Sequence, residues 1–284
     1  MSSDAMSRDP MSRDDVAALV CVRLAREVDD GDLIVLGSFT PMAYSAYLLA
    51  KATHAPGAFV VAYSALDVAP FSLSLMGTEA GALAAPAGRI EMIDVVHRIH
   101  QRGRGDVEAV SAPQMDGELR FNYAWIGPGG DRPLRLPGGA GAPEVIHHHR
   151  KLLAYFPRHR PEVLCGAVDY VSATRPPERL AATRILTDLA VLAPRDGRLA
   201  VESIHPGVTR AQVDEATGFP LVWPDEVEVT VPPSEAELDA LRRVDPQGTL
   251  RLEFVDGRGR RSLLRELLDA EERRADRYRA AARG

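Results

Sequence analysis

The stretch from residue 31 to residue 67, GDLIVLGSFTPMAYSAYLLAKATHAPGAFVVAYSALD, constrains the fold of this chain more than any other part. Residues 33–36 and 59–63 are short apolar runs, as expected for strands that are covered on both faces. Between them, residues 42–53 carry apolar side chains at helical spacing, and Pro41 suits the first turn of a helix because its missing N–H is not needed there. The stretch therefore predicts a strand–loop–helix–strand unit, and open α/β sheets place ligands at the carboxyl ends of such strands.

Further strands and helices follow along the chain. Helices are expected at residues 14–28, 90–100, 209–217 and 234–244, and strands at residues 107–112, 119–125, 151–155, 168–171, 184–192 and 198–204. The helices at 209–217 and 234–244 each begin with a capping box, Thr209 with Gln212 and Ser234 with Glu237. Mixed strands and helices with Gly-rich loops after the strands predict an α/β fold built on an open sheet.

The two ends of the chain differ in character from the middle. Residues 1–13 are polar and predict a disordered leader, because they lack the apolar core of a signal peptide. Residues 14–255 are expected to form the α/β domain. Residues 256–284 predict a charged amphipathic helix, which either docks on the domain or binds a partner.

Composition narrows the possible partners. The formal net charge is −6 and the pI is about 5.8, which argues against binding to nucleic acid or to an anionic membrane surface. No apolar run approaches the roughly 20 residues that span a bilayer. The two cysteines, Cys21 and Cys165, do not form a disulfide framework, and the expected location is the cytoplasm.

Several short motifs, in order and spacing, carry a resemblance to one enzyme family. They are Asp30-Gly31-Asp32, Pro41-Met42-Ala43, Thr53-His54-Ala55-Pro56, Gln114-Met115-Asp116, Asp131-Arg132-Pro133, Arg135-Leu136-Pro137-Gly138, Thr187-Asp188-Leu189 and Ser203-Ile204-His205-Pro206-Gly207. With these motifs, residues 14–250 resemble the B (beta) subunit of family I CoA-transferases of the glutaconate CoA-transferase type. The same resemblance includes the B subunit of the hydrolase that opens a steroid-derived ring as a CoA thioester.

The resemblance implies an open α/β sheet of the CoA-transferase type and a hetero-oligomer with an A-type (alpha) subunit. In the transferases the B subunit supplies a glutamate at the end of the second strand, and this carboxylate attacks the acyl-CoA thioester. The corresponding position here is Ser64. A serine forms an ordinary ester, from which return of the acyl group to a thiol is uphill. Glu79, the nearest carboxylate downstream, is expected to be a solvated loop residue.

The loop after the first strand is the first group of residues expected at the substrate. It comprises Gly37, Ser38, Phe39 and Pro41, and Phe39 stands where the family usually has a second glycine. A bulky side chain at Phe39 is expected to crowd the thioester or to reshape the acyl pocket. The scaffold motifs are therefore kept, while the positions nearest the chemistry are altered.

The second group of expected substrate- or CoA-binding residues lies in the middle of the chain. Its members are Gln114, Asp116, Arg132, Gly138 and Gly141. Gln114 and Asp116 suit a ligand-facing strand end or a structural turn. Arg132, like Arg135, suits a CoA phosphate, a substrate carboxylate or an acid across a subunit interface. The glycines allow backbone N–H groups to approach a ligand closely.

Two histidine features are expected to be structural. Consecutive residues on a helix point about 100° apart, so His147, His148 and His149 cannot all bind one ion, and a wet helix face is expected. His205 is expected to organise the turn into the following helix. No metal site and no permanently bound cofactor are predicted, and coenzyme A is expected as part of the substrate.

The resemblance, together with the altered positions, implies three possible functions. The first is a B subunit of an enzyme that hydrolyses or cleaves a carbon–carbon bond of a (cyclic) 3-keto acyl-CoA, with a glutamate of the A subunit activating water. The second is a diverged beta subunit of a CoA-transferase that moves CoA between carboxylic acids. The third is a non-catalytic, structural or regulatory B subunit.

Overall fold

The computed structural model describes residues 11–37, 40–69, 72–73, 75, 86–127 and 133–281, with side chains in the last helix described up to residue 273 and at residue 276. The chain separates into two compact units. The first unit comprises residues 1–20 and 96–232, and the second comprises residues 21–95 and 233–284. The boundaries expected for a leader, a central domain and a C-terminal helix stay predictions.

The second unit is built on the strand–loop–helix–strand stretch. Its strands are β1 (Leu33–Leu36), β2 (Phe59–Ala62), β3 (Ala65–Leu66) and β4 (Gly88–Arg89), hydrogen-bonded in that order. β1 and β2 are parallel, whereas β3 and β4 each run antiparallel to the strand before. Both β1 and β2 are almost wholly buried, which explains their continuous apolar sequences.

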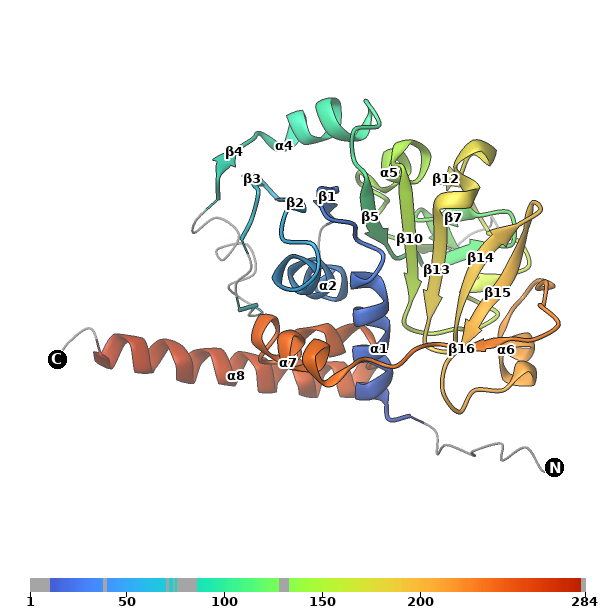
Figure 1. Cartoon of the computed structure of the whole chain (residues 1–284). Helices are drawn as coiled ribbons and strands as arrows, with labels where there is room; N and C mark the ends of the chain where they lie inside the picture. Colours follow the sequence, from blue (N-terminus) through green and yellow to red (C-terminus); the bar gives the residue numbers. More distant parts are fainter. Residues whose placement is uncertain are drawn as a thin grey trace. The chain divides into compact units, whose positions relative to one another are not determined.

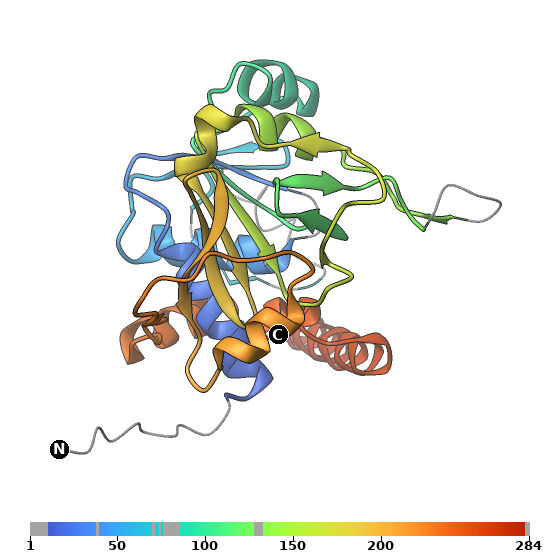
Figure 2. The same cartoon turned by 90° about the vertical axis from the view of Figure 1, so that its right-hand side faces the viewer.

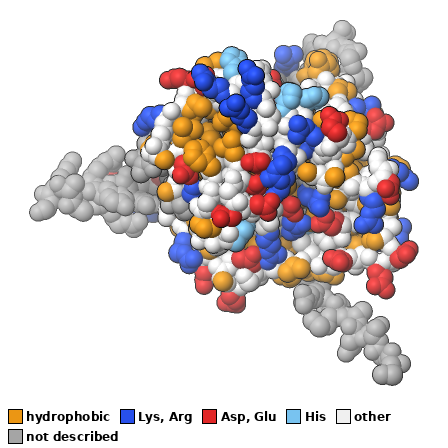
Figure 3. Space-filling view, turned by 45° about the horizontal axis from the view of Figure 1, so that its top comes forward, with side chains coloured by type: hydrophobic (Ala, Val, Ile, Leu, Met, Phe, Trp, Pro, Cys, Tyr) orange, Lys and Arg blue, Asp and Glu red, His pale blue; other side chains and the backbone are white. Residues whose placement is uncertain are grey.

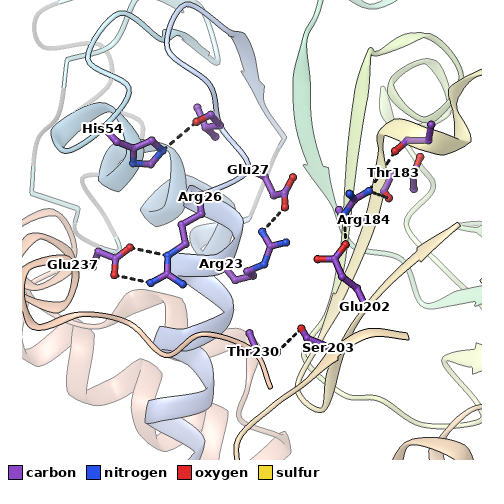
Figure 4. Close-up of polar contacts among 12 residues, drawn as sticks. Arg23, Arg26, Glu27, His54, Thr183, Arg184, Glu202, Ser203, Thr230 and Glu237 are labelled. Carbon is purple, nitrogen blue, oxygen red and sulfur yellow. Dashed lines mark hydrogen bonds and ion pairs between the residues drawn. The ribbon is translucent and has the colours of Figure 1, made fainter. Parts of the chain in front are cut away.

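Helix α2 (Pro41–Ala52) is the buried helix of the second unit, with nine consecutive buried residues from Met42 to Ala50. Other helices in the described part of this unit are α4 (Met92–Asp94), α7 (Glu235–Val244), η3 (Thr249–Glu253), α8 (Gly257–Ala281) and the end of α1 (Arg13–Ala25). α2 packs against α7 and η3, and η3 packs against α8 (Figure 1). Arg26, which follows α1, forms a bidentate ion pair with Glu237 on α7, and both N–O distances are 2.8 Å (Figure 4). This ion pair connects an early and a late segment of the sequence.

The first unit contains a six-strand run of mixed direction. Its order is β16 (Glu228–Val229), β15 (Arg198–Ile204), β14 (Ala190–Arg195), β13 (Thr183–Thr187), β10 (Lys151–Phe156) and β5 (Val107–Val110). β10 runs parallel to β5 and β13, whereas β13, β14 and β15 are successively antiparallel. Figure 2 shows β13 to β15 side by side. This run and its covering residues form a buried apolar core, in which Phe156 and Ile185 are almost fully buried.

Smaller elements complete the first unit. A four-stranded sheet has the order β11 (Leu164–Cys165), β6 (Gln114–Asp116), β7 (Arg120–Asn122) and β12 (Ala173–Thr174), and a hairpin pairs β8 (Trp125–Ile126) with β9 (Leu134–Arg135). The helical segments are η1 (Val95–His100), α5 (Ala142–His148), η2 (Pro177–Ala182) and α6 (Arg210–Ala216). The predicted α/β class is confirmed, and so are both capping boxes, Thr209 with Gln212 and Ser234 with Glu237.

Three predicted strands are wrong. Residues 119–125 form β7 and the start of β8, which belong to different sheets. Residues 184–192 form parts of two antiparallel strands, because the Thr187 hydroxyl accepts hydrogen bonds from the N–H groups of Leu189 and Ala190 and closes a turn. Residues 168–171 form no strand. The backbone N–H of Asp169 donates to the side chain of Gln114 instead of to a neighbouring strand.

No helix in the described part of the chain is long and apolar enough to cross a membrane. On the face drawn in Figure 3, positive and negative side chains are interspersed. Neither positive nor negative side chains dominate that face.

Candidate functional site

The carboxyl ends of β1 and β2 meet at one edge of the second unit's sheet. Leu36 lies opposite Ala62 in the parallel register, so Gly37 and Tyr63 each follow directly at that edge. Ser64 comes one residue later. The loop that begins at Gly37 and the turn that holds Ser64 are therefore neighbours at the position where open α/β sheets bind ligands.

Ser64 lies in a two-residue turn between β2 and β3. Ala62 pairs with Ala65 across this turn, and the Ser64 carbonyl accepts a hydrogen bond of 3.1 Å from Ile90 N. Tyr63 has φ 55°, a left-handed conformation that few non-glycine residues adopt. The tight hairpin leaves Ser64 half-buried rather than in the core.

The start of α2 is occupied by a carboxylate of the same chain. Glu253 Oε1 accepts a hydrogen bond of 2.8 Å from Met42 N, in the first turn of the helix. A helix N-terminus attracts anions through its free N–H groups and its dipole. Glu253 thus supplies that negative charge from inside the fold. Sequence reasoning missed Glu253, because it lies more than 200 positions from α2 in a short 3₁₀ helix with no motif.

Asp245 holds the segment that carries Glu253. This buried carboxylate accepts hydrogen bonds from the N–H and hydroxyl of Thr249, at 2.8 and 2.9 Å, and from Leu250 N at 3.0 Å. It also accepts one from the hydroxyl of Ser45 on α2, at 3.3 Å. The geometry at the start of α2 therefore depends on the C-terminal part of the chain.

Gln114 is engaged in a buried amide network in the first unit. Its Oε1 accepts hydrogen bonds from Asn122 Nδ2 at 2.7 Å and from Asp169 N at 3.1 Å, and its Nε2 donates to Asp169 Oδ2 at 3.0 Å. Asp169 Oδ2 also accepts one from Gly127 N. The network ties β6, β7 and the loop at residue 169 together. A substrate-binding role for Gln114 stays a prediction.

Asp116 is fully buried and closes the turn between β6 and β7. Its Oδ1 accepts from the N–H groups of Glu118 and Arg120, and its Oδ2 accepts from Arg120 Nε at 2.7 Å. The side chain of Arg120 is about two-thirds buried beside it. This arrangement stabilises the turn, and the predicted ligand contact of Asp116 stays a prediction.

The Gly-rich segment leads into α5. Gly138 has φ 98°, which glycine adopts without strain, and its N–H donates to the carbonyl of Tyr123. Gly141 is the N-cap residue of α5, and a Cβ there would lie 3.6 Å from the ring of His100. The predicted residues Ser38, Phe39 and Arg132, and also Glu79, lie outside the described residues.

A surface pocket of about 270 Å³ lies in the first unit. Its lining comes from α5 and β12 with the neighbouring Ser172, and it includes Glu144, His147 and His148. No residue of the predicted substrate site lines it.

His205 and His159 are buried and hydrogen-bonded within the fold. His205 Nε2 donates to the carbonyl of Thr187 at 2.9 Å, and its Nδ1 accepts from the hydroxyl of Thr230. His159 contacts the hydroxyls of Thr187 and Thr217, and burial lowers its pKa to about 4. The His159 ring is therefore neutral at neutral pH, and both rings connect separate segments of the first unit.

The expectation for the three consecutive histidines is wrong in one respect. α5 ends at His148, and His149 adopts an extended conformation with ψ 147° as the chain enters β10. His147 is exposed, but His149 is fully buried and contacts His100. His149 therefore does not belong to a wet helix face.

Comparison with known proteins decides the family. The chain is 30% identical to the B subunit of 3-oxoadipate CoA-transferase from Pseudomonas knackmussii over 240 residues, which are 80% of this chain and 92% of that protein. The chain belongs to the family of CoA-transferase beta subunits. No protein-family model matches it.

The proteins similar to this CoA-transferase-family beta subunit belong to enzymes that catalyse different reactions. It is 28% identical to the IpdB subunit of the cholesterol ring-cleaving hydrolase of Mycobacterium tuberculosis over 256 residues, 84% of this chain and 97% of that one. Among solved structures, it resembles the decarboxylase AibA/AibB with 29% identity and a TM-score of 0.76, over 83% of this chain and 96% of that chain. The glutaconate CoA-transferase of Acidaminococcus fermentans shares the fold, with 19% identity and a TM-score of 0.71 over 87% of this chain and 98% of that chain.

These findings confirm the predicted family, the fold type and an enzyme subunit. CoA is a substrate moiety of the transferases in the family. Family members thus include a transferase, a hydrolase and a decarboxylase, so family membership alone does not fix the reaction of this beta subunit.

Proposed function

We propose that this chain is the B subunit of a heteromeric enzyme that acts on an acyl-CoA thioester by hydrolysis or carbon–carbon cleavage of a (cyclic) 3-keto acyl-CoA. Its partner is an A-type subunit, which supplies the base. The single observation that carries the proposal is the serine in the turn after β2, Ser64, which we assign from the resemblance to the position of the transferase glutamate.

The chemistry of a serine at that position argues against CoA transfer. An anhydride or thioester on a carboxylate keeps the acyl group activated, whereas a serine ester does not. The described part of the second unit also places Glu253 against Met42 N in the first turn of α2, where it stabilises the helix start. That carboxylate is bound to the backbone and is not a free nucleophile.

Water replaces the nucleophile in the proposed reaction. A carboxylate of the A subunit removes a proton from water, and the resulting hydroxide adds to the 3-keto carbon. The bond between carbons 2 and 3 breaks, a carboxylate forms at carbon 3, and carbon 2 of the remaining CoA thioester takes up a proton. Gly37, Pro41 and the Ser64 turn supply part of the pocket wall and backbone donors for the oxyanion.

CoA transfer is the second candidate. The 30% identity to the B subunit of 3-oxoadipate CoA-transferase favours it. In that case an acid acceptor would be required, and an adduct would form on one of the two subunits during turnover.

The test is a product assay on the complex of this chain with an A-type subunit encoded beside it. With a cyclic 3-keto acyl-CoA, the proposal expects consumption of substrate without any acceptor acid and no stimulation by acetate or succinate. Strict dependence on an acceptor acid, with CoA recovered on that acid, would overturn the proposal. Each subunit alone serves as the control and is expected to be inactive.

A further inference from the structure

Three side chains from separate elements of the first unit meet in its interior. His100 ends η1, Glu108 lies in β5, and His149 follows α5. Their exposed fractions are 6%, 5% and 0%. His100 Nδ1 is 2.8 Å from His149 Nε2, and Glu108 Oε2 is 3.8 Å from His100 Nδ1 and 4.0 Å from His149 Nδ1.

Hydrogen bonds within the fold do not satisfy this cluster. Among the described residues, neither Glu108 Oε2 nor His149 Nδ1 has a hydrogen-bond partner, although both atoms are buried. The hydroxyl of the buried Tyr123 also lacks one among the described residues. Unpaired buried polar atoms are costly, and two of them on neighbouring side chains, Glu108 Oε2 and His149 Nδ1 at 4.0 Å, indicate a shared ligand.

We propose that His100, Glu108 and His149 form a buried binding site for a divalent transition-metal ion, with Zn²⁺ preferred. The possible ligand atoms of the three residues all lie within 4.8 Å of one another. In a tetrahedral site with metal–ligand bonds of about 2.0–2.1 Å, ligand atoms are about 3.3 Å apart. With one nitrogen from each imidazole, the separations of 2.8 Å between His100 Nδ1 and His149 Nε2 and of 3.8 Å between His100 Nδ1 and Glu108 Oε2 lie on either side of that value, so side-chain rotations bring the atoms into place.

The donor set determines the class of ion. Two imidazole nitrogens and one carboxylate oxygen suit Zn²⁺ and its neighbours, whereas Ca²⁺ and Mg²⁺ prefer all-oxygen sites. A dication would also neutralise the buried carboxylate of Glu108, which lies beside the two imidazoles.

The surroundings hold His149 in place for this role. A Cβ at Gly105 would lie 2.2 Å from His149 Cε1, so only glycine leaves room for the ring. The His149 carbonyl accepts hydrogen bonds from the buried guanidinium of Arg175 and from Arg179. The ring of His149 stacks on that of His100 with centroids 5.0 Å apart. The cluster uses no residue of the predicted substrate site.

The test is metal content and Co²⁺ titration of the full chain in complex with its A subunit. The expected result is one Zn²⁺ or Co²⁺ per B subunit, with the intense visible absorption of tetrahedral Co²⁺, and a Tm about 3 °C or more above that of the chelator-treated protein. Glu108→Gln and His100→Gln should each weaken Co²⁺ binding at least about 30-fold. His147→Gln, a change at the exposed histidine next to the cluster, should leave binding unchanged.

Two results would overturn the proposal. One is a folded wild-type complex that binds no stoichiometric Zn²⁺ or Co²⁺. This measurement uses the wild-type protein alone, so it does not depend on how any variant folds. The other is a folded Glu108→Gln or His100→Gln variant that binds Co²⁺ as tightly as His147→Gln does.

Discussion

The guanidinium of Arg175 donates a hydrogen bond of 2.9 Å to the backbone carbonyl of His149, and Arg175 is 1% exposed. The same group donates to the carbonyls of Ile146 and Arg150, each at 2.9 Å. Arg175 thus caps the C-terminal end of α5, where carbonyls lack partners within the helix. Burial lowers its pKa to about 10, so it stays charged at neutral pH.

Arg175→Lys is expected to lower the free energy of unfolding by about 2–4 kcal/mol, because an ammonium group cannot reach the spread of carbonyls that the planar guanidinium reaches. Urea unfolding followed by circular dichroism measures this change. Arg184→Lys, at the part-exposed ion pair with Glu202, is the matched control and should cost less than about 1 kcal/mol. Equal losses for the two variants would contradict the capping role.

Glu253→Ala is expected to cost about 1–2 kcal/mol of unfolding free energy, because Met42 N loses its acceptor and the start of α2 loses a favourable charge. Chemical denaturation of the full chain tests this expectation. Glu272→Ala on the exposed surface of α8 should change stability by less than about 0.5 kcal/mol. A Glu253→Ala chain as stable as Glu272→Ala would show that the contact contributes nothing.

His159 should make stability fall in mild acid. Burial lowers its pKa to about 4 in the folded chain, while the unfolded value is about 6.5. The unfolded state therefore takes up the proton first, so stability is full above pH 6.5 and is lost progressively as the pH falls toward 4. The expected loss is at most about 3 kcal/mol. His159→Gln should flatten this part of the pH profile of the urea midpoint, and an unchanged slope would refute it.

Ser64→Ala is expected to leave turnover of the complex within about threefold of wild type, because the proposed reaction uses water and no serine nucleophile. Steady-state kinetics on the 3-keto acyl-CoA measure kcat and KM. Ser72→Ala is the control, because it removes a serine hydroxyl elsewhere in the same unit, one that donates to the Arg243 carbonyl. A loss of about 100-fold or more in kcat for Ser64→Ala alone would assign a chemical role to the serine.

The strand–loop–helix–strand stretch at residues 31–67 was predictable because its sequence signals are local. The apolar runs of β1 and β2, with Pro41 at the start of α2, follow from strand burial and from helix-start preferences. The capping boxes at Thr209 and Ser234 were equally local and are confirmed.

The features that sequence reasoning missed depend on contacts between distant residues. The turn after Thr187 forms through a side-chain hydroxyl, so an apolar run that reads as one strand divides into two. Glu253 reaches Met42 across 211 positions, and no spacing rule connects them. His149 differs from its two neighbours because the helix ends before it. Its partners His100 and Glu108 come from other elements.

The central claim of the proposed function is that no acyl or CoA adduct forms on this chain, because the proposal assigns Ser64 to the position of the transferase glutamate. Intact-mass spectrometry of the complex, quenched during turnover of a 3-keto acyl-CoA, tests it directly. The account predicts an unmodified beta chain, with or without hydroxylamine treatment. A beta chain that carries a hydroxylamine-sensitive CoA adduct during turnover would contradict it.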